Sequence, residues 1–251
     1  MALNALAGGI RGGIAFLTRF PIHADEGDWG RFSSFPAAFP LVGYLIGALV
    51  AVPFVVPTIG ATTAAFGYLL ALVLVIGIPH LDGVADLGDA MAAHGDTRKK
   101  ALKDTNVGVG AIVAVAIAVL GLVLAGIEIA QLPVLVAVGI VITAEVGAKL
   151  GMATVACLGT ASHEGMGSAF TRGTDARLLL GPILVSLPAV FVFTPFPIGF
   201  AVIAAGPLVA VLLVRWATRT LGGVNGDIFG ATNELGRVLA LHMGVIAWTL
   251  S

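Results

Sequence analysis

The chain has 251 residues, of which 58% are hydrophobic and 11% are charged, and its formal net charge is −1. A soluble domain carries about 25% charged residues, so this composition excludes a protein whose surface is mostly in water. The balanced charge gives no electrostatic reason to expect nucleic acid as a partner, and the single cysteine, Cys157, excludes an internal disulfide.

The first predicted element lies within residues 1–35, where apolar residues recur at helical spacing with Arg11 and Arg19 among them. This pattern is typical of a helix at the membrane interface. Apolar stretches of about 20 residues, long enough to cross a bilayer, then follow at 36–57, 61–79, 108–127, 133–152, 178–194 and 198–214. A last apolar stretch, 238–250, is short for a full span.

The expected fold is therefore an all-α polytopic membrane helix bundle with about six to seven transmembrane helices after the interfacial N-terminal segment. No linker divides the chain, so residues 1–251 are expected to form a single integral membrane domain.

Lysine and arginine are distributed unevenly between the two ends of the expected bundle. They occur in three polar segments, at 80–107, 153–177 and 215–237. They are absent from the alternate connections, near 58–60, 128–132 and 194–197. By the positive-inside rule the N-terminus and the polar segments face the cytoplasm of a cell membrane. Any chemistry is then expected at the cytoplasmic boundary.

The most informative polar segment contains Asp82, Asp86 and Asp89, spaced four and three residues apart. On a helix this spacing places three carboxylates on one face, where their charges repel. A divalent cation would relieve the repulsion, and Mg²⁺ prefers such hard oxygen ligands. A solvated, charged end of a loop is the alternative interpretation. His80 lies beside this run as a ligand, a base or an interfacial residue.

A second candidate site lies in the run 103–110, where Lys103 precedes Asp104, Asn106 and Gly108. Glycines at the start of a helix expose backbone amides, and these attract anions such as phosphate. Basic residues at a cytoplasmic helix end are also expected from topology alone, so both interpretations stay open.

The third polar segment offers Asn225, Asp227 and Glu234 as further oxygen ligands on the same membrane face. A glycine-rich turn that caps a helix explains the same pattern without a ligand. Inside the fourth stretch, Glu145 and Lys149 stand four residues apart, and intramembrane charges are usually paired or functional. We expect an ion pair that faces the bundle, with Lys149 a lesser candidate for contact with a substrate phosphate.

Several runs, in this order along nearly the whole chain, resemble the cobalamin synthase family, the adenosylcobinamide-GDP ribazoletransferases. These runs lie at 16–21, 39–43, 80–86, 103–110, 164–167 and 222–227. The His-Leu-Asp-Gly run that begins at His80, with Ala85-Asp86 after it, is the most specific of them. Asn106 stands where the family more often has an arginine.

The resemblance implies transfer of adenosylcobinamide phosphate from adenosylcobinamide-GDP to α-ribazole or its 5′-phosphate, with release of GMP. The hypothesis for its mechanism has Mg²⁺ held by Asp82, Asp86 and Asp89, and Asp104 or Asp227 as the base. The expected substrate and phosphate contacts are His80, Lys103, Asn106, Gly108, Lys149, Asn225 and Glu234. Homo-oligomers and complexes with other cobalamin-assembly enzymes are left open.

Two other classes are compatible with a chain of this kind. Asp82 to Asp86 also resembles the first half of the CDP-alcohol phosphotransferase signature, but the second half does not follow at its spacing. A transporter would be expected to carry polar groups deep in several spans, and here only Glu145 and Lys149 qualify.

Overall fold

The computed structural model describes residues 2–56, 58–93, 106–192 and 196–251. Within these ranges the chain is helical and has no strand, which confirms the all-α prediction. The helices are α1 (Ala2–Leu17), α2 (Glu26–Ser33), α3 (Ala38–Val50), η1 (Val52–Val55), α4 (Ala61–Val75), α5 (Pro79–Ala92), α7 (Val109–Ile129), α8 (Val134–Leu158), α9 (Met166–Thr171), η2 (Ala176–Leu179), α10 (Leu180–Ser186), η3 (Leu187–Phe191), α11 (Phe196–Thr220) and α12 (Gly226–Thr249).

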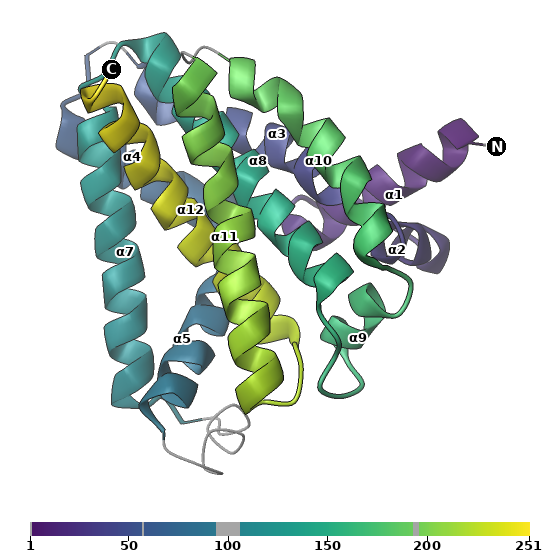
Figure 1. The fold of residues 1–251 in the computed structure, drawn as a ribbon. Helices are drawn as coiled ribbons and strands as arrows, with labels where there is room; N and C mark the ends of the chain where they lie inside the picture. The colour runs from purple at the N-terminus through teal and green to yellow at the C-terminus, as the bar shows by residue number, and fades with distance from the viewer. Residues whose placement is uncertain (1, 57, 94–105, 193–195) are drawn as a thin grey trace.

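Helix α8 is the central element of the bundle, and most of its side chains are buried. It packs against α3, α11 and α12, while α7 covers α4, α5 and α12 on the other side (Figure 1). Small residues let these helices approach one another closely. A Cβ added at Gly151 would lie 2.8 Å from the carbonyl oxygen of Gly206 in α11, and one at Gly47 would lie 2.8 Å from Cα of Ile142.

Three described helices are long and apolar enough to cross a membrane: α7, α8 and α11. Two bent pairs, α2 with α3 at 103° and α4 with α5 at 98°, raise the number to as many as five. The described residues therefore reach fewer spans than the six to seven expected. The apolar helical run Ala176–Phe191, which overlaps the stretch expected to cross at 178–194, is shorter than the three membrane-length helices, and Pro188 lies in its last 3-10 turn, Leu187–Phe191.

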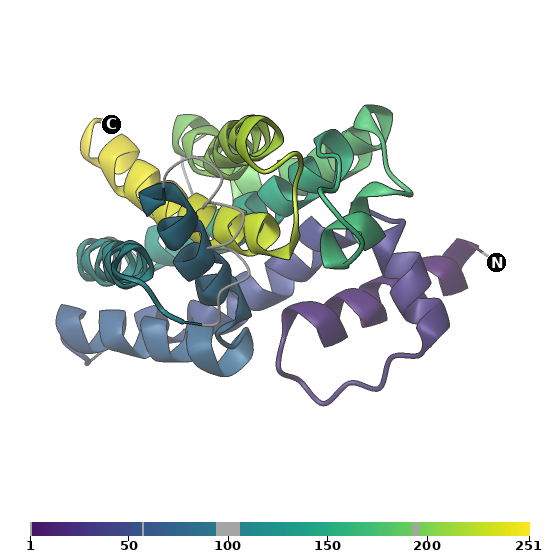
Figure 2. The same cartoon turned by 90° about the horizontal axis from the view of Figure 1, so that it is seen from below.

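The two ends of the bundle differ in what they carry. Helices α5, α8 and α11 finish at one end, where α9 also lies, and α7 and α10 finish at the other (Figure 1). Seen from below, α5 crosses beside the start of α12 (Figure 2). The described parts of the three predicted polar segments thus lie at one end of the molecule, and we call it the polar end.

Helices α1 and α2 pack on each other beside the polar end. The Asp28 carboxylate is buried between them, where it accepts a hydrogen bond from Nε of Arg11 at 2.5 Å and another from Arg31 at 3.2 Å. Phe16 of α1 packs edge-on against Phe170 of α9, with ring centroids 5.5 Å apart. The N-terminal segment is therefore fixed to the part of the bundle that holds the candidate site.

Candidate functional site

Asp82 and Asp86 on α5 and Asp227 in the first turn of α12 gather at the polar end. Gly83 makes this possible, because a Cβ there would lie 2.6 Å from the carbonyl oxygen of Asp227 and 3.1 Å from the amide of Ala231. Only a residue without a side chain lets α5 lie this close to α12. Helix α5 has 14 residues, too few to cross a bilayer by itself, and lies outside the three membrane-length helices.

The carboxylates influence one another's protonation. Burial, followed by the charges of Asp227, Asp82 and Asp89, raises the pKa of Asp86 to about 6. Burial and the charge of Asp82 also raise the pKa of Asp227, although the Asn225 side chain, which donates to Oδ2 at 2.6 Å, opposes that shift. The neighbouring negative charges therefore disfavour the ionised forms of Asp86 and Asp227, which is the condition that a bound cation relieves.

Asp89 has a different set of partners from the other two aspartates of α5. Its carboxylate accepts hydrogen bonds from the backbone amides of Gly108 at 2.8 Å and Ala111 at 2.9 Å. It thereby caps the start of α7. The Gly108 amide donates its hydrogen bond to Asp89. It is therefore not left free to bind a substrate phosphate, as the sequence had suggested for Gly108.

The donor set at the polar end fits Mg²⁺ in its chemistry, since Asp82, Asp86 and Asp227 offer hard oxygen ligands. Among the described residues, no group of three histidine, cysteine or acidic side chains is already arranged to hold a metal ion. Mg²⁺ usually keeps several waters and binds substrate phosphates as well, so two or three carboxylates of this kind are sufficient.

The start of α12 is fixed by the turn before it. Gly222, at φ +84°, adopts a left-handed backbone conformation that favours glycine. Val224 then exchanges backbone hydrogen bonds with Thr160 and Ser162 of the connection after α8. Asn225 caps the helix by accepting from the amide of Ile228 at 3.2 Å. The predicted alternative for this segment, a glycine-rich turn that caps a helix, is confirmed, with Asn225 as the capping residue.

A buried ion network connects α8 with α12. The predicted pair of Glu145 and Lys149 is confirmed at 3.4 Å, and Arg237 also binds Glu145, with its Nη2 3.1 Å from Oε2. Arg237 further donates to Glu234 at 2.5 Å. The four side chains are almost fully buried, and their formal charges cancel. Such a network is costly to bury unless each charge has a partner.

The network ends at His80. The side-chain oxygen of Asn233 accepts from Lys149 at 2.7 Å, so its nitrogen faces Nδ1 of His80 at 3.0 Å. That nitrogen can only donate, which leaves Nδ1 as an acceptor and places the imidazole proton on Nε2. Burial lowers the pKa of His80 well below its usual value, which keeps the ring neutral.

Two predicted substrate contacts, Lys149 and Glu234, are instead buried within this network. Lys149 is fully buried and bonded within the bundle, so it is not placed to meet a substrate phosphate. Glu234 is likewise buried, because it pairs with Arg237. Arg237, in the third predicted polar segment, is also buried, with only 1% of it exposed. The sequence signal that could have shown this is the i, i+3 spacing of Glu234 and Arg237 opposite two intramembrane charges.

A cavity of about 290 Å³ opens beside the carboxylates, between α1, α5, α8, α9 and α12. Its apolar walls include Phe16, Phe170, Phe229, Met152 and Met166. Its polar lining comes from His80, Asp82 and Asp227. The sequence indicated these polar residues, but the aromatic wall was missed because its members come from three distant helices.

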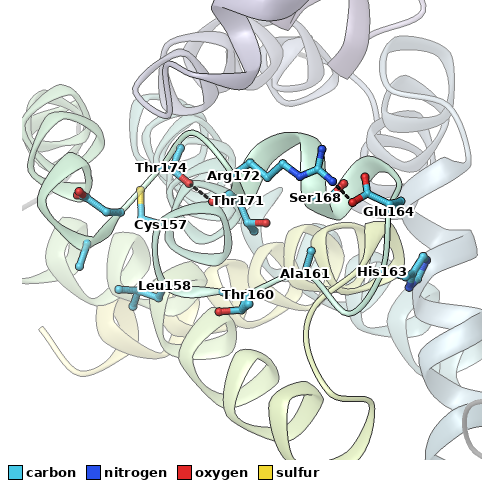
Figure 3. A pocket seen from close by; sticks show the side chains of 13 residues that line it. Cys157, Leu158, Thr160, Ala161, His163, Glu164, Ser168, Thr171, Arg172 and Thr174 are labelled. Carbon is cyan, nitrogen blue, oxygen red and sulfur yellow. Dashed lines mark hydrogen bonds and ion pairs between the residues drawn. The ribbon is translucent and has the colours of Figure 1, made fainter.

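A second, larger hollow of about 710 Å³ lies on the other side of α9. Figure 3 shows its polar lining, with Arg172 paired to Glu164 and with Thr160 and His163 on the connection after α8. His163 and Glu164 both lie in the connection that leads to α9. Lys103 and Asp104 fall outside the described residues, and Asn106 is exposed just before α7.

The fold and the site define a class: a helical membrane protein with clustered carboxylates and a small aromatic cavity at one end of its bundle. The family described as cobalamin-5-phosphate synthase matches residues 9–245. The chain belongs to that family.

Similar proteins bear the name adenosylcobinamide-GDP ribazoletransferase. The protein of Halorubrum lacusprofundi is 46% identical, over 99% of both chains. That of Halobacterium salinarum is 49% identical over 75% of this chain and 96% of its own length. That of Haloquadratum walsbyi is 41% identical over 96% of this chain and 98% of its own. No solved structure matches the chain.

Proposed function

We propose that this protein joins adenosylcobinamide-GDP to α-ribazole, or to its 5′-phosphate, and releases GMP. The observation that carries the proposal is the family match over residues 9–245, together with the carboxylates that converge at the polar end of this bundle. A CDP-alcohol phosphotransferase and a transporter are the competing classes, and neither has a comparable observation in its favour.

The reaction forms one bond and breaks one. A ribose hydroxyl oxygen of the acceptor bonds to the phosphorus attached to cobinamide, and the bond from that phosphorus to the bridging oxygen breaks. The bridging oxygen leaves with GMP, and the hydroxyl proton passes to a base. Asp227 fits the role of base, because its raised pKa favours holding a proton and it lines the cavity. Asp104 is the second candidate.

Asp82 and Asp86, with Asp89 as the third predicted ligand, would hold Mg²⁺ at this site. Bound there, Mg²⁺ would neutralise negative charge on the diphosphate and on the departing GMP. Asp82 and Asp86 are the stronger candidates, because the Asp89 carboxylate already caps α7. Lys103 would add a positive charge for the phosphates. We further propose that the polar end faces the cytoplasm of the cell membrane, as the distribution of lysine and arginine favours.

Release of GMP from adenosylcobinamide-GDP by the purified protein tests the proposal. We expect release that requires both α-ribazole and Mg²⁺. Asp82→Ala and Asp86→Ala should each lower the rate at least a hundredfold while expression and membrane insertion stay normal. Glu128→Gln is the matched control, since Glu128 is an exposed acid at the opposite end of α7.

Three results would contradict the proposal in different ways. Absence of GMP release by the wild-type protein, with transport of a solute into vesicles, would favour a transporter. CMP release from a CDP-alcohol would favour the phosphotransferase class. Normal rates in both aspartate variants would remove the metal assignment but leave the overall reaction in place.

A further inference from the structure

The cavity beside the carboxylates has walls that no step of the proposed reaction explains. Phe170 and Phe229, with ring centroids 5.4 Å apart, are almost fully covered by protein, and the partly exposed Phe16 and Met166 present apolar surface beside them. We propose that this cavity receives the flat, apolar base of the acceptor nucleoside. This inference rests on the proposed function, and it assigns the acceptor's place within that same site.

Size separates the groups that the two substrates could insert. The cavity measures about 290 Å³, which is near the lower limit of pockets that enclose drug-sized ligands. A corrin has four reduced pyrrole rings with amide side chains and is too large for this space. The two fused rings of dimethylbenzimidazole, the base of α-ribazole, are of suitable size, and so is guanine.

Polarity separates those two bases. Guanine carries an amino group, a carbonyl and ring nitrogens on its edge, and these would lose hydrogen bonds to water among phenylalanine and methionine side chains. Dimethylbenzimidazole has an apolar edge and one unsubstituted ring nitrogen, which accepts a single hydrogen bond. Aromatic rings also stack favourably on flat apolar bases.

His80 supplies the matching donor. The ring lines the cavity, and its Nδ1 accepts from Asn233, so the proton is carried by Nε2. One hydrogen-bond donor in an apolar cavity matches a base with one acceptor. Asn233 acts as a positioning residue here, since it fixes the tautomer without lining the cavity.

The carboxylates complete the arrangement. Asp82 and Asp227 line the same cavity as the aromatic residues. A nucleoside whose base is held by the aromatic wall would therefore carry its ribose toward the carboxylates, where a hydroxyl can lose its proton. The donor's diphosphate would approach from outside the cavity.

Gly226 provides a way to fill the cavity with a single substitution. It lines the cavity, and a Cβ added there would meet only Met166, with its Sδ at 3.6 Å, which is ordinary van der Waals contact. Gly226→Leu should therefore fold and narrow the space. Gly30→Leu is the matched control, because Gly30 is an exposed helical glycine with no atom within 4 Å of an added Cβ.

Steady-state kinetics on both substrates give the readout. We expect Gly226→Leu to raise the KM for α-ribazole at least tenfold and to keep the KM for adenosylcobinamide-GDP within twofold of the wild-type value. The control Gly30→Leu should have the wild-type KM for both substrates. Benzimidazole riboside, which lacks two methyl groups, should bind the wild type about tenfold more weakly than α-ribazole. The Gly226→Leu substitution should weaken the binding of benzimidazole riboside less than it weakens the binding of α-ribazole.

The outcomes separate this inference from the proposed function. If the KM for adenosylcobinamide-GDP rises and that for α-ribazole does not, part of the donor occupies the cavity. If neither KM changes, neither substrate occupies it. Either result overturns the inference. Absence of GMP release by the wild type would overturn the proposed function itself. If Gly226→Leu does not fold, Met166→Trp tests the same space from a half-exposed wall position.

Discussion

Asp86 is the residue whose protonation depends most clearly on its neighbours at the polar end. Its folded pKa of about 6 lies above the ordinary 3.8, first because of burial and then because of Asp227, Asp82 and Asp89. The folded protein therefore binds a proton more tightly than the unfolded chain does. Stability from this group is fully present below pH 3.8 and is lost as the pH rises through 6.

Asp86→Asn should consequently stabilise the metal-free protein at neutral pH. In detergent with a chelator, we expect a higher Tm for the variant than for the wild type at pH 7.5. The difference should shrink as the pH falls toward 4.5, where the wild-type carboxyl is protonated as well. Thermal unfolding of both proteins across this pH range measures it. A Tm difference independent of pH would contradict the assignment.

At the residue scale, the sequence indicated which aspartates share a face but not which partners they have. The four-residue spacing of Asp82 and Asp86 was sufficient to group them. The hydrogen bonds of Asp89 to the start of α7 could not be foreseen, because they depend on how two helices meet after an intervening segment. The burial of Lys149 beside Asn233 depended in the same way on the packing of α12.

At the element scale, the crossing of α5 on α12 sets the geometry of the site, and Gly83 is its contact point. Gly83→Ala places a Cβ 2.6 Å from the carbonyl oxygen of Asp227. This oxygen belongs to the backbone of α12, so the clash can be relieved only if α5 or α12 shifts. The displaced α5 should lower the rate of GMP release at least tenfold, because catalytic groups must be held within a fraction of an ångström.

Gly30→Ala is the control for that substitution, as it adds the same methyl group at an open position of α2. We expect its rate to equal that of the wild type, with both variants purified as folded protein. A Gly83→Ala protein with full activity would show that α5 and α12 need not be in close contact for the reaction.

The ion network joins α12 to α8. Arg237→Gln would leave Glu145 and Glu234 with too little positive charge, and loss of one partner of a buried pair costs about 3–5 kcal/mol. Thermal unfolding in detergent should show a large fall in Tm. Adding Glu145→Gln restores the balance of one lysine and one glutamate, so the double variant should recover part of the loss. No recovery would contradict a charge-based explanation.

The helices themselves were predictable to different degrees. The stretches expected at 108–127 and 133–152 correspond closely to α7 and α8, since a long apolar run without proline has few alternatives. The stretch expected at 36–57 is interrupted by a 3-10 turn that includes Pro53, and the bend of 98° between α4 and α5 was not foreseen. Hydropathy reports the apolar surface of a segment and says little about the direction in which it runs.

For the whole molecule, the distribution of charge predicts an orientation that labelling can test. With the buried Cys157 replaced by alanine, single cysteines at Gly60 and Asp175 would report on opposite ends of the bundle. In right-side-out vesicles, a membrane-impermeant maleimide should react with Gly60→Cys, and in inverted vesicles with Asp175→Cys. The reverse pattern would place the polar end outside the cytoplasm.

The closure of the ion network by α12 has a consequence for how the protein is made. Glu145 and Lys149 enter the membrane with α8, long before Glu234 and Arg237 leave the ribosome in the last helix. Until α12 is inserted, the two charges of α8 lie in hydrocarbon and have only each other as ion-pair partners. A nascent chain that stops before residue 226 should therefore be held by insertion machinery or degraded. Cellular quality control would thus depend on whether α12 has been inserted.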